Sequence, residues 1–279
     1  AGLLFGLGWS AAWRALVQLD DSDKTLHLAE GPTVHRLVLE PNERLELPPV
    51  HLVFFDGGFE KGSNACRRYI REHVTPDAPD GLILPPLAYT IWPGIVAPYT
   101  ETDVYPQIDA AADMGVEVFI IDDAWYPGDF PKGRGNWYPD PAKWPSGFDK
   151  VAEYVKSRGM GLGLFFEPGV AMVGTQLLNE HPEFFYSYAD AAGTRVYRFS
   201  DSAARAHILE LVSGFVERYD LRYIRWDHNL DAIPFIRDED PTLKLVFAHV
   251  RGLYDVWETL LDRHPRLALE SCAAGGRRL

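Results

Sequence analysis

Acidic side chains follow several apolar runs of this sequence at the points where the runs end. They are Asp122, Asp123, Glu167 and Asp227. In a parallel barrel the carboxyl ends of the strands meet at one face, so these carboxylates are expected to face one cavity. A single acid at a strand end is often a helix cap or half of a loop ion pair. Acids at three successive strand ends indicate a functional site instead.

Asp227 has the surroundings of a nucleophilic carboxylate. Arg225 comes two residues earlier, and the alternation of side chains along a strand places both on the same side. A cation there keeps the carboxylate ionised and can also bind a substrate hydroxyl. The alternative is a structural Arg–Asp ion pair with no catalytic role.

The adjacent pair Asp122 and Asp123 suits two kinds of ligand. Neighbouring carboxylates can bind sugar hydroxyls or a divalent metal ion, but a metal ion needs further oxygen ligands. No HxH or DxD pattern nearby supplies them, so we expect no metal and no cofactor. We interpret His228 as a hydrogen-bond partner of Asp227 rather than as a metal ligand. Cys272 has no dedicated His–Asn pair, and we interpret it as a residue that lines the pocket.

The second part of the chain alternates between two kinds of segment. The apolar runs that predict buried parallel strands are Leu87–Trp92, Val116–Ile121, Gly161–Phe166, Leu221–Trp226 and Leu267–Glu270. The amphipathic stretches that predict helices are Asp103–Met114, Phe148–Arg158, Ala203–Tyr219 and Thr242–His264. This order indicates an α/β fold, the (β/α)8 TIM-type barrel. Such a barrel takes about 250 residues, more than follow Pro86. We therefore expect a barrel that is incomplete at its C-terminus, with its first five strands.

The first part of the chain has the pattern of a β-sandwich. Its short, partly alternating runs are Thr25–Leu28, Val34–Leu39 and Val50–Phe55. A short basic helix is expected at Asn64–His73, followed by a proline-rich linker at Thr75–Pro86. The predicted regions are the end of an N-terminal sandwich at 1–60, a helix and linker at 61–86, and the barrel at 87–279.

Composition narrows the class of protein. The net charge of −13 disfavours nucleic acid as a partner. No apolar run reaches the roughly 20 residues of a membrane span, and no signal peptide is visible, which favours a cytoplasmic location. The aromatic content of 13%, with 8 Trp and 13 Tyr, suits the stacking surfaces of a sugar site. Oligomerisation is compatible with these values.

Several motifs together resemble glycoside hydrolase family 36, the α-galactosidases. They are IIDDAWY, GLGLFFEPG, YIRWDHN and ESCAAGG, in that order, with GNWYPDPAKWPSGFDKVAEYVKSRGM between the first two. The early segments WSAAWR, LEPNERLELPPV and RRYIREH resemble the end of that family's N-terminal β-sandwich. The resemblance implies a retaining exo-α-glycosidase that acts on a small carbohydrate such as an α-galactoside oligosaccharide.

The resemblance also implies a role for single residues. Asp227 falls on the family's catalytic nucleophile, and Asp122 and Asp123 fall on the aspartates that bind the galactose hydroxyls. The other implied substrate-binding residues are Arg225, Asn229, Cys272, Phe165, Trp125 and Arg195, with Arg198 as the alternative to Arg195.

Three positions depart from the residues that are common in the family. Phe165 stands in place of Trp, Gly169 in place of Glu, and Arg225 in place of Lys. Arg is larger and forked, so the last change is not conservative. A pocket without that Trp and Glu could accept an N-acetyl group or another epimer. An α-N-acetylgalactosaminidase, an α-galactosyl transferase and a non-catalytic sugar-binding barrel therefore stay open as alternatives.

The family's acid/base aspartate lies on the strand after the SC motif, which by the resemblance falls beyond Leu279. We therefore expect that the chain is a fragment and that residues 1–279 by themselves are inactive.

Overall fold

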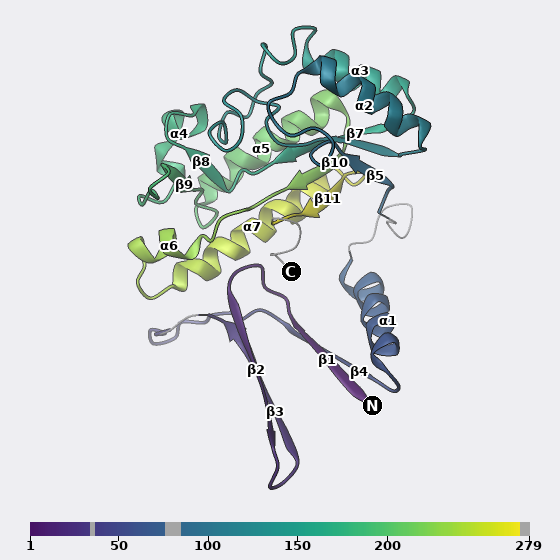
Figure 1. Cartoon of the computed structure of the whole chain (residues 1–279). Helices are drawn as coiled ribbons and strands as arrows, with labels where there is room; N and C mark the ends of the chain where they lie inside the picture. The colour runs from purple at the N-terminus through teal and green to yellow at the C-terminus, as the bar shows by residue number, and fades with distance from the viewer. Residues whose placement is uncertain (34–36, 76–84, 274–279) are drawn as a thin grey trace. The chain divides into compact units, whose positions relative to one another are not determined.

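The chain divides into two compact units. The computed structural model describes residues 1–33, 37–75 and 85–273. Residues 1–75 belong to the first unit and residues 85–273 to the second (Figure 1). The finer division into regions 1–60, 61–86 and 87–279 stays a prediction.

Parallel strands in chain order form the centre of the second unit (Figure 1). The strands are β5 (Ala88–Thr90), β6 (Val118–Ile121), β7 (Gly161–Phe166), β10 (Leu221–Trp226) and β11 (Ala268–Ser271). The helices between successive strands are α2 (Glu101–Asp113), α3 (Phe148–Ser157), α5 (Ser202–Tyr219) and α7 (Lys244–Arg263). This is the order of successive β/α units in a barrel. The predicted parallel α/β sheet is confirmed for the described residues, and it is consistent with an incomplete (β/α)8 barrel.

One face of this sheet is buried under the helices. Its fully buried side chains in the apolar core are Phe119, Ile121, Leu164, Phe166, Ile224 and Trp226. They alternate along their strands with residues that face the other way, as the period of two in a strand requires. The helices contribute apolar faces to the same core, including Val151 and Val155 of α3 and Ile208 and Val212 of α5.

Capping fixes where helices end and strands begin. The Asp201 carboxylate accepts the backbone N–H groups of Ala203 and Ala204 at 2.8 and 2.9 Å, which starts α5. Asp220 ends that helix in the left-handed conformation with φ of 50°, and β10 begins at the next residue. At α2, the Asp103 carboxylate accepts the Thr100 N–H at 2.8 Å. The helix therefore begins at Glu101, two residues before its predicted start.

Short elements in the connections were not predicted. After β7 come the antiparallel strands β8 (Val170–Met172) and β9 (Thr194–Val196), with α4 (Gln176–Glu180) and a turn of 3-10 helix (Pro182–Phe184) between them. After β10 comes α6 (Ile233–Glu239). These pieces are too short for a hydrophobic period to show. Among the described residues, no helix is long and apolar enough to cross a membrane.

The first unit contains two antiparallel strand pairs. β1 (Gly2–Leu7) pairs with β4 (Val50–Phe55), and β2 (Trp13–Asp20) pairs with β3 (Thr25–Pro32). The expected strand Val34–Leu39 is wrong in its described part, because residues 37–39 form no strand, while 34–36 lie outside the described residues.

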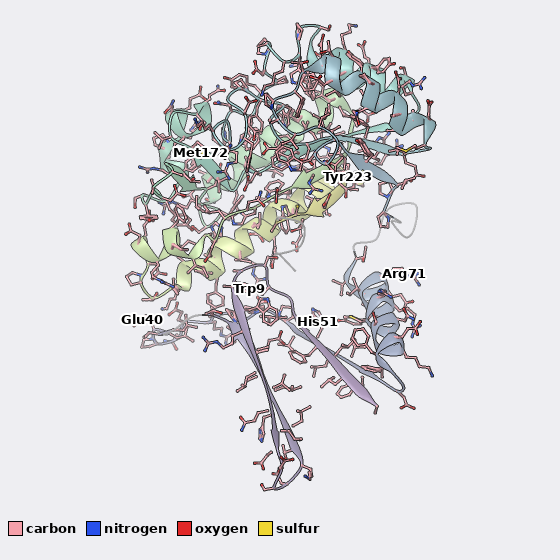
Figure 2. All side chains as sticks on the ribbon, viewed as in Figure 1. Trp9, Glu40, His51, Arg71, Met172 and Tyr223 are labelled. Carbon is pink, nitrogen blue, oxygen red and sulfur yellow. The ribbon has the colours of Figure 1, made fainter. Side chains whose placement is uncertain are left out.

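Helix α1 packs on one of these pairs. It spans Phe59–Tyr69, continues as a π-helical turn at Ile70–Val74, and begins before the predicted Asn64. The Phe55 ring of β4 lies against Gly62. The His51 side chain, labelled in Figure 2, forms a hydrogen bond of 2.7 Å with Tyr69.

Each strand pair also presents an apolar face. Paired residues of an antiparallel ladder share a face, so Val17 and Leu19 of β2 lie with Leu28 and Leu26 of β3. All four side chains are exposed. A β-sandwich buries such faces between its sheets. This supports the sandwich, which stays a prediction.

Replacing Gly252 by alanine should destabilise the second unit. A Cβ at this position of α7 would overlap the carbonyl oxygen of Phe199, so helix and loop would have to separate. Overpacking of this kind costs about 1–3 kcal/mol, measurable as a lower urea midpoint of the purified gene product.

Gly214→Ala is the matched control. Gly214 lies in the exposed face of α5 and a Cβ there meets nothing within 4 Å. Alanine should raise stability by about 0.5–1 kcal/mol through its helix propensity. An unchanged midpoint for Gly252→Ala would show that α7 does not pack this closely.

Candidate active site

Polar residues gather on the face of the sheet that the helices do not cover. Because Ile121, Phe166 and Trp226 point into the helix-covered core, the residues that follow them point the other way. The polar residues of this face near the strand ends are Thr90, Asp122, Glu167, Arg225, Asp227 and Glu270. The sheet therefore brings predicted site residues from different strands to one edge.

Arg225 connects three of these strands. Its Nη1 lies 2.8 Å from Glu270 Oε1, its Nη2 donates to Cys272 Sγ at 3.3 Å, and its Nε lies 3.3 Å from Asp122 Oδ2. The hydroxyl of Tyr223 donates to the other Glu270 oxygen at 3.1 Å (Figure 2). The structure thus joins the predicted residues Asp122, Arg225 and Cys272 in one network.

The charges around Arg225 have a larger effect on its pKa than its burial has. Burial by itself lowers the pKa of the guanidinium, but Asp122 and Glu270 raise it, so the net shift is upward. Asp227 adds a smaller effect in the same direction. The ion pairs of Arg225 are made with Asp122 and Glu270, which leaves Asp227 oriented by other groups.

Asp122 is held by groups from several segments. Its Oδ1 accepts the Asp123 N–H at 2.8 Å, and its Oδ2 accepts the Thr90 hydroxyl. The Tyr99 hydroxyl donates to the backbone carbonyls of Asp122 and Asp123 at 2.9 and 2.8 Å. These bonds fix the turn after β6.

Asp123 is buried beside a strained residue. Its Oδ1 accepts the Ala124 N–H at 2.6 Å and the Tyr126 hydroxyl. Ala124 has φ of 70°, a left-handed conformation that is unfavourable for a residue with a Cβ. Lys143 holds the same turn through the carbonyls of Ala124 and Tyr126, at 2.7 and 2.9 Å. Burial raises the pKa of the Asp123 carboxyl to about 7, although its hydrogen bonds oppose that rise.

Asp227 is anchored on both its backbone and its side chain. Its N–H donates to the Phe166 carbonyl of β7 at 2.7 Å. Its Oδ1 accepts the His228 N–H and its Oδ2 accepts the Asn229 side-chain amide, each at 2.8 Å. Only 7% of the residue is exposed. The carboxylate therefore has one fixed orientation, as a positioned nucleophile requires.

Glu167 links the loop after β10 to the loop after β6. Its Oε1 accepts the Asn229 N–H at 2.7 Å, and its Oε2 pairs with Arg134 Nη1 at 3.1 Å. The side chain is fully buried. Burial raises the pKa of this carboxyl, Arg134 and the Asn229 N–H offset part of the rise, and Asp227 adds to it.

Trp125 lies in the core beside the turn after β6, and the substrate contact expected for it stays a prediction. It is fully buried, and its ring packs against Trp137, Phe148 and Phe166. Its indole N–H donates to the Phe165 carbonyl at 2.8 Å. Trp125 therefore ties the turn after β6 to β7 from the core side.

The other predicted residues lie in different surroundings. Phe165 is buried, and by strand alternation it lies on the same face as Arg225, its neighbour in the register with β10. Arg195 lies on β9 opposite Ala171 and is partly exposed. Their contact with substrate stays a prediction.

Arg198, the alternative to Arg195, is held by several contacts, and its own contact with substrate stays a prediction. Its guanidinium forms an ion pair with Glu239, donates to the Phe185 carbonyl at 3.0 Å, and lies 4.7 Å from the centre of the Tyr186 ring.

Gly169 and His228 fit each other closely. A Cβ at Gly169 would lie 2.9 Å from Nδ1 of His228, which is too close for the imidazole to stay in place. A side chain at 169 and this position of His228 therefore exclude each other. Within the described residues, no three His, Cys, Asp or Glu side chains gather as metal ligands.

Several residues of the site were not predicted from the sequence. They are Thr90, Tyr99, Tyr126, Arg134 and Glu270. Glu270 could have been found, because it precedes Cys272 by two residues in a strand, as Arg225 precedes Asp227. Arg134 lies in a long connection between β6 and α3, where no spacing rule applies.

Comparison with solved structures shows that the fold of this chain is a known one. The α-galactosidase AgaA of Geobacillus stearothermophilus, described as a GH36 enzyme, superposes with a TM-score of 0.82 at 23% identity, covering 99% of this chain and 40% of that one. The α-galactosidase of Lactobacillus brevis gives a TM-score of 0.79 at 22% identity, with 99% and 38% coverage. At these identities the likeness shows the fold.

The family follows from the sequence. The Melibiase family profile matches residues 44–279, and the chain belongs to this family. Alpha-galactosidase 2 of Pediococcus pentosaceus is 27% identical over 291 residues, which cover 100% of this chain and 40% of the relative. Alpha-galactosidase Mel36A of Lactobacillus acidophilus is 27% identical over 286 residues, with 98% and 39% coverage. The chain thus spans about 40% of the length of these relatives.

Asp123→Asn should make stability less dependent on pH. Because the pKa of Asp123 is near 7 in the fold and near 4 in the unfolded chain, folding favours the protonated form. The ionised carboxyl therefore costs stability progressively as the pH rises from about 4 to about 7. Asparagine stays neutral and its Oδ1 can accept the same two hydrogen bonds. The gain in melting temperature from Asp123→Asn should be larger at pH 8 than at pH 5.

Asp190→Asn serves as the control for this measurement. Asp190 Oδ1 also accepts two backbone N–H groups, those of Ala192 and Thr194, but on a partly exposed turn. Its effect on melting temperature should be the same at both pH values. Equal gains for Asp123→Asn at pH 5 and pH 8 would contradict the effect of burial on Asp123.

Proposed function

We propose that the protein containing this chain is a retaining exo-α-glycosidase that hydrolyses terminal α-galactosides. The observation that carries the proposal is the fixed Asp227 carboxylate at the end of β10, on the same face as the Asp122–Arg225 pair. The family of the chain and the names of its relatives support galactose as the sugar that is cleaved off. Variants of AgaA from Geobacillus stearothermophilus are described in complex with raffinose and with stachyose, both carbohydrates.

Asp227 attacks the anomeric carbon in the proposed mechanism. A glycosyl-aspartate forms while a second carboxylic acid protonates the leaving oxygen, and the same group then removes a proton from the water that releases the sugar. The resemblance to the family assigns that acid/base to an aspartate beyond Leu279. The bonds from His228 and Asn229 leave the Asp227 carboxylate in one orientation before substrate binds.

Asp122, Asp123 and Arg225 bind the sugar hydroxyls in this proposal. A hydroxyl donates to a carboxylate and accepts from a guanidinium, so the Asp122–Arg225 pair satisfies both of its hydrogen-bonding roles. Hydrogen bonds to charged groups contribute about 1.5–3 kcal/mol each. Cys272, held beside Arg225, lines the same pocket, and Asn229 acts through its bond to Asp227.

Altered sugar specificity is the second candidate function. The imidazole of His228 occupies the space that a side chain at residue 169 would need, so the pocket differs where the family commonly has Glu. An α-N-acetylgalactosaminidase or an α-galactosyl transferase would use the same nucleophile. A non-catalytic sugar-binding barrel would use only the binding residues.

A panel of p-nitrophenyl glycosides separates these candidates. The full-length gene product should cleave the α-galactoside at least about tenfold faster, in kcat/KM, than the N-acetyl-α-galactosaminide, a margin of about 1.4 kcal/mol. Adding an acceptor sugar should leave hydrolysis as the main outcome. Faster cleavage of the N-acetyl sugar, a disaccharide product, or no cleavage at all would each favour one of the alternatives.

Asp227→Gly should abolish turnover and leave the fold intact. Loss of a nucleophile that acts as part of a unit lowers kcat by roughly 10⁴–10⁶-fold. Added azide should enter the vacated space and restore cleavage in part, giving a glycosyl azide of inverted stereochemistry. Steady-state kinetics and NMR of the product measure both effects.

Asp113→Gly at the exposed end of α2 is the control, and it should keep wild-type kcat. If Asp227→Gly retained more than about a tenth of wild-type kcat, Asp227 could not be the nucleophile.

A further inference from the structure

The buried pair of Glu167 and Arg134 belongs to none of the roles assigned above. Glu167 follows the last residue of β7, and Arg134 comes from the connection between β6 and α3. The Glu167 side chain is fully buried and that of Arg134 is 10% exposed. A buried ion pair contributes little net stability compared with apolar packing, so its position next to the nucleophile loop suggests another use.

We propose that Glu167 is a positioning residue that fixes the Asp227 carboxylate through Asn229. Two consecutive residues of one segment hold the nucleophile loop: the Phe166 carbonyl accepts the Asp227 N–H at 2.7 Å, and Glu167 Oε1 accepts the Asn229 N–H at 2.7 Å. The Asn229 side chain then donates to Asp227 Oδ2 at 2.8 Å. This inference rests on the proposed nucleophilic role of Asp227.

Arg134 fixes the other oxygen of the Glu167 carboxylate. Arg134 is itself held, because its Nε donates to the Pro131 carbonyl at 3.0 Å and its Nη2 lies 3.6 Å from Met172 Sδ on β8 (Figure 2). The Thr194 hydroxyl contacts the same sulfur at 3.4 Å. A rigid cation on one side of Glu167 therefore sets where its second oxygen meets the Asn229 N–H.

Residue 167 needs a side chain that accepts hydrogen bonds from both Arg134 and the Asn229 N–H. Glutamine has one oxygen, which accepts, and one NH₂ group, which donates. In Glu167→Gln the NH₂ group must therefore face either Arg134 or the Asn229 N–H, which are themselves donors. If its oxygen turns to Arg134, the NH₂ repels the Asn229 N–H, and if it turns to Asn229, the NH₂ faces the guanidinium. Replacing Arg134 by methionine removes the conflict and lets the glutamine oxygen stay on Asn229.

Steady-state kinetics of the full-length gene product test the proposal. Glu167→Gln should lower kcat on p-nitrophenyl α-galactoside about 10–100-fold, the effect of a small misplacement of a reacting group. KM should stay within about twofold, because the binding residues Asp122 and Arg225 are untouched. The double variant Glu167→Gln with Arg134→Met should have a kcat at least about threefold higher than Glu167→Gln alone, a difference of about 0.65 kcal/mol.

Amide hydrogen exchange gives a second measurement that needs no turnover. Exchange at the Asn229 amide should be at least about fivefold faster in Glu167→Gln than in the wild type, because its acceptor is lost or displaced. If the gene product had no glycosidase activity, the proposed function would fail, and this exchange would still show whether Glu167 holds the loop.

Glu101→Gln is the matched control. Glu101 is another buried glutamate that accepts a backbone N–H, that of Ser146 at 3.1 Å, but it lies at the start of α2. It should lower the melting temperature without a selective loss of kcat. Three results would overturn the proposal. They are a kcat for Glu167→Gln within twofold of wild type, a loss of kcat/KM that comes from a higher KM, and unchanged exchange at the Asn229 amide.

Discussion

The alternation of side chains along parallel strands is the constraint on which the rest of this site depends. Each strand buries one row of side chains under helices, as Ile121, Phe166 and Trp226 show, so the residues after them must face the opposite side. Parallel pairing then brings the ends of β6, β7 and β10 to one edge. Asp122, Glu167 and Asp227 lie on that side because each follows a core residue, and Glu270 lies there through its register with Arg225. Asp123, one residue further on, is held in the buried turn after β6.

So many buried carboxylates would repel one another without compensation. Arg225 lies between Asp122 and Glu270, and Arg134 pairs with Glu167, so the two cations compensate three of the acids. Asp123 has no cation among its main influences, and its pKa rises to about 7. Asp227 is instead oriented by N–H donors from its own loop. Each acid thus has a different environment, which lets neighbouring carboxylates take different roles.

The strands and the site residues at their ends could be predicted because they follow local rules. Asp227 and Arg225 share a face by strand alternation, and Asp122 follows an apolar run. The order of residues along the chain is therefore enough to predict where these side chains lie. Arg134 could not be predicted, because its contact with Glu167 spans 33 positions and depends on the path of a long connection. The burial of Trp125 could not be predicted for a related reason: after the left-handed Ala124, sequence position no longer tells which way a side chain points.

The residues that depart from the family's common pattern have neighbours that fit them in charge or in space. Arg225 divides its nitrogens among Glu270, Cys272 and Asp122, so the fork of the guanidinium is fixed in a way that a lysine ammonium would not be. His228 fills the space over Gly169. Changing one member of either set would leave a buried charge or a gap, so each set acts as a unit. Carboxylates outnumber cations at this edge, so its electrostatic field disfavours anionic ligands. The neutral sugar of the proposed function is compatible with that field.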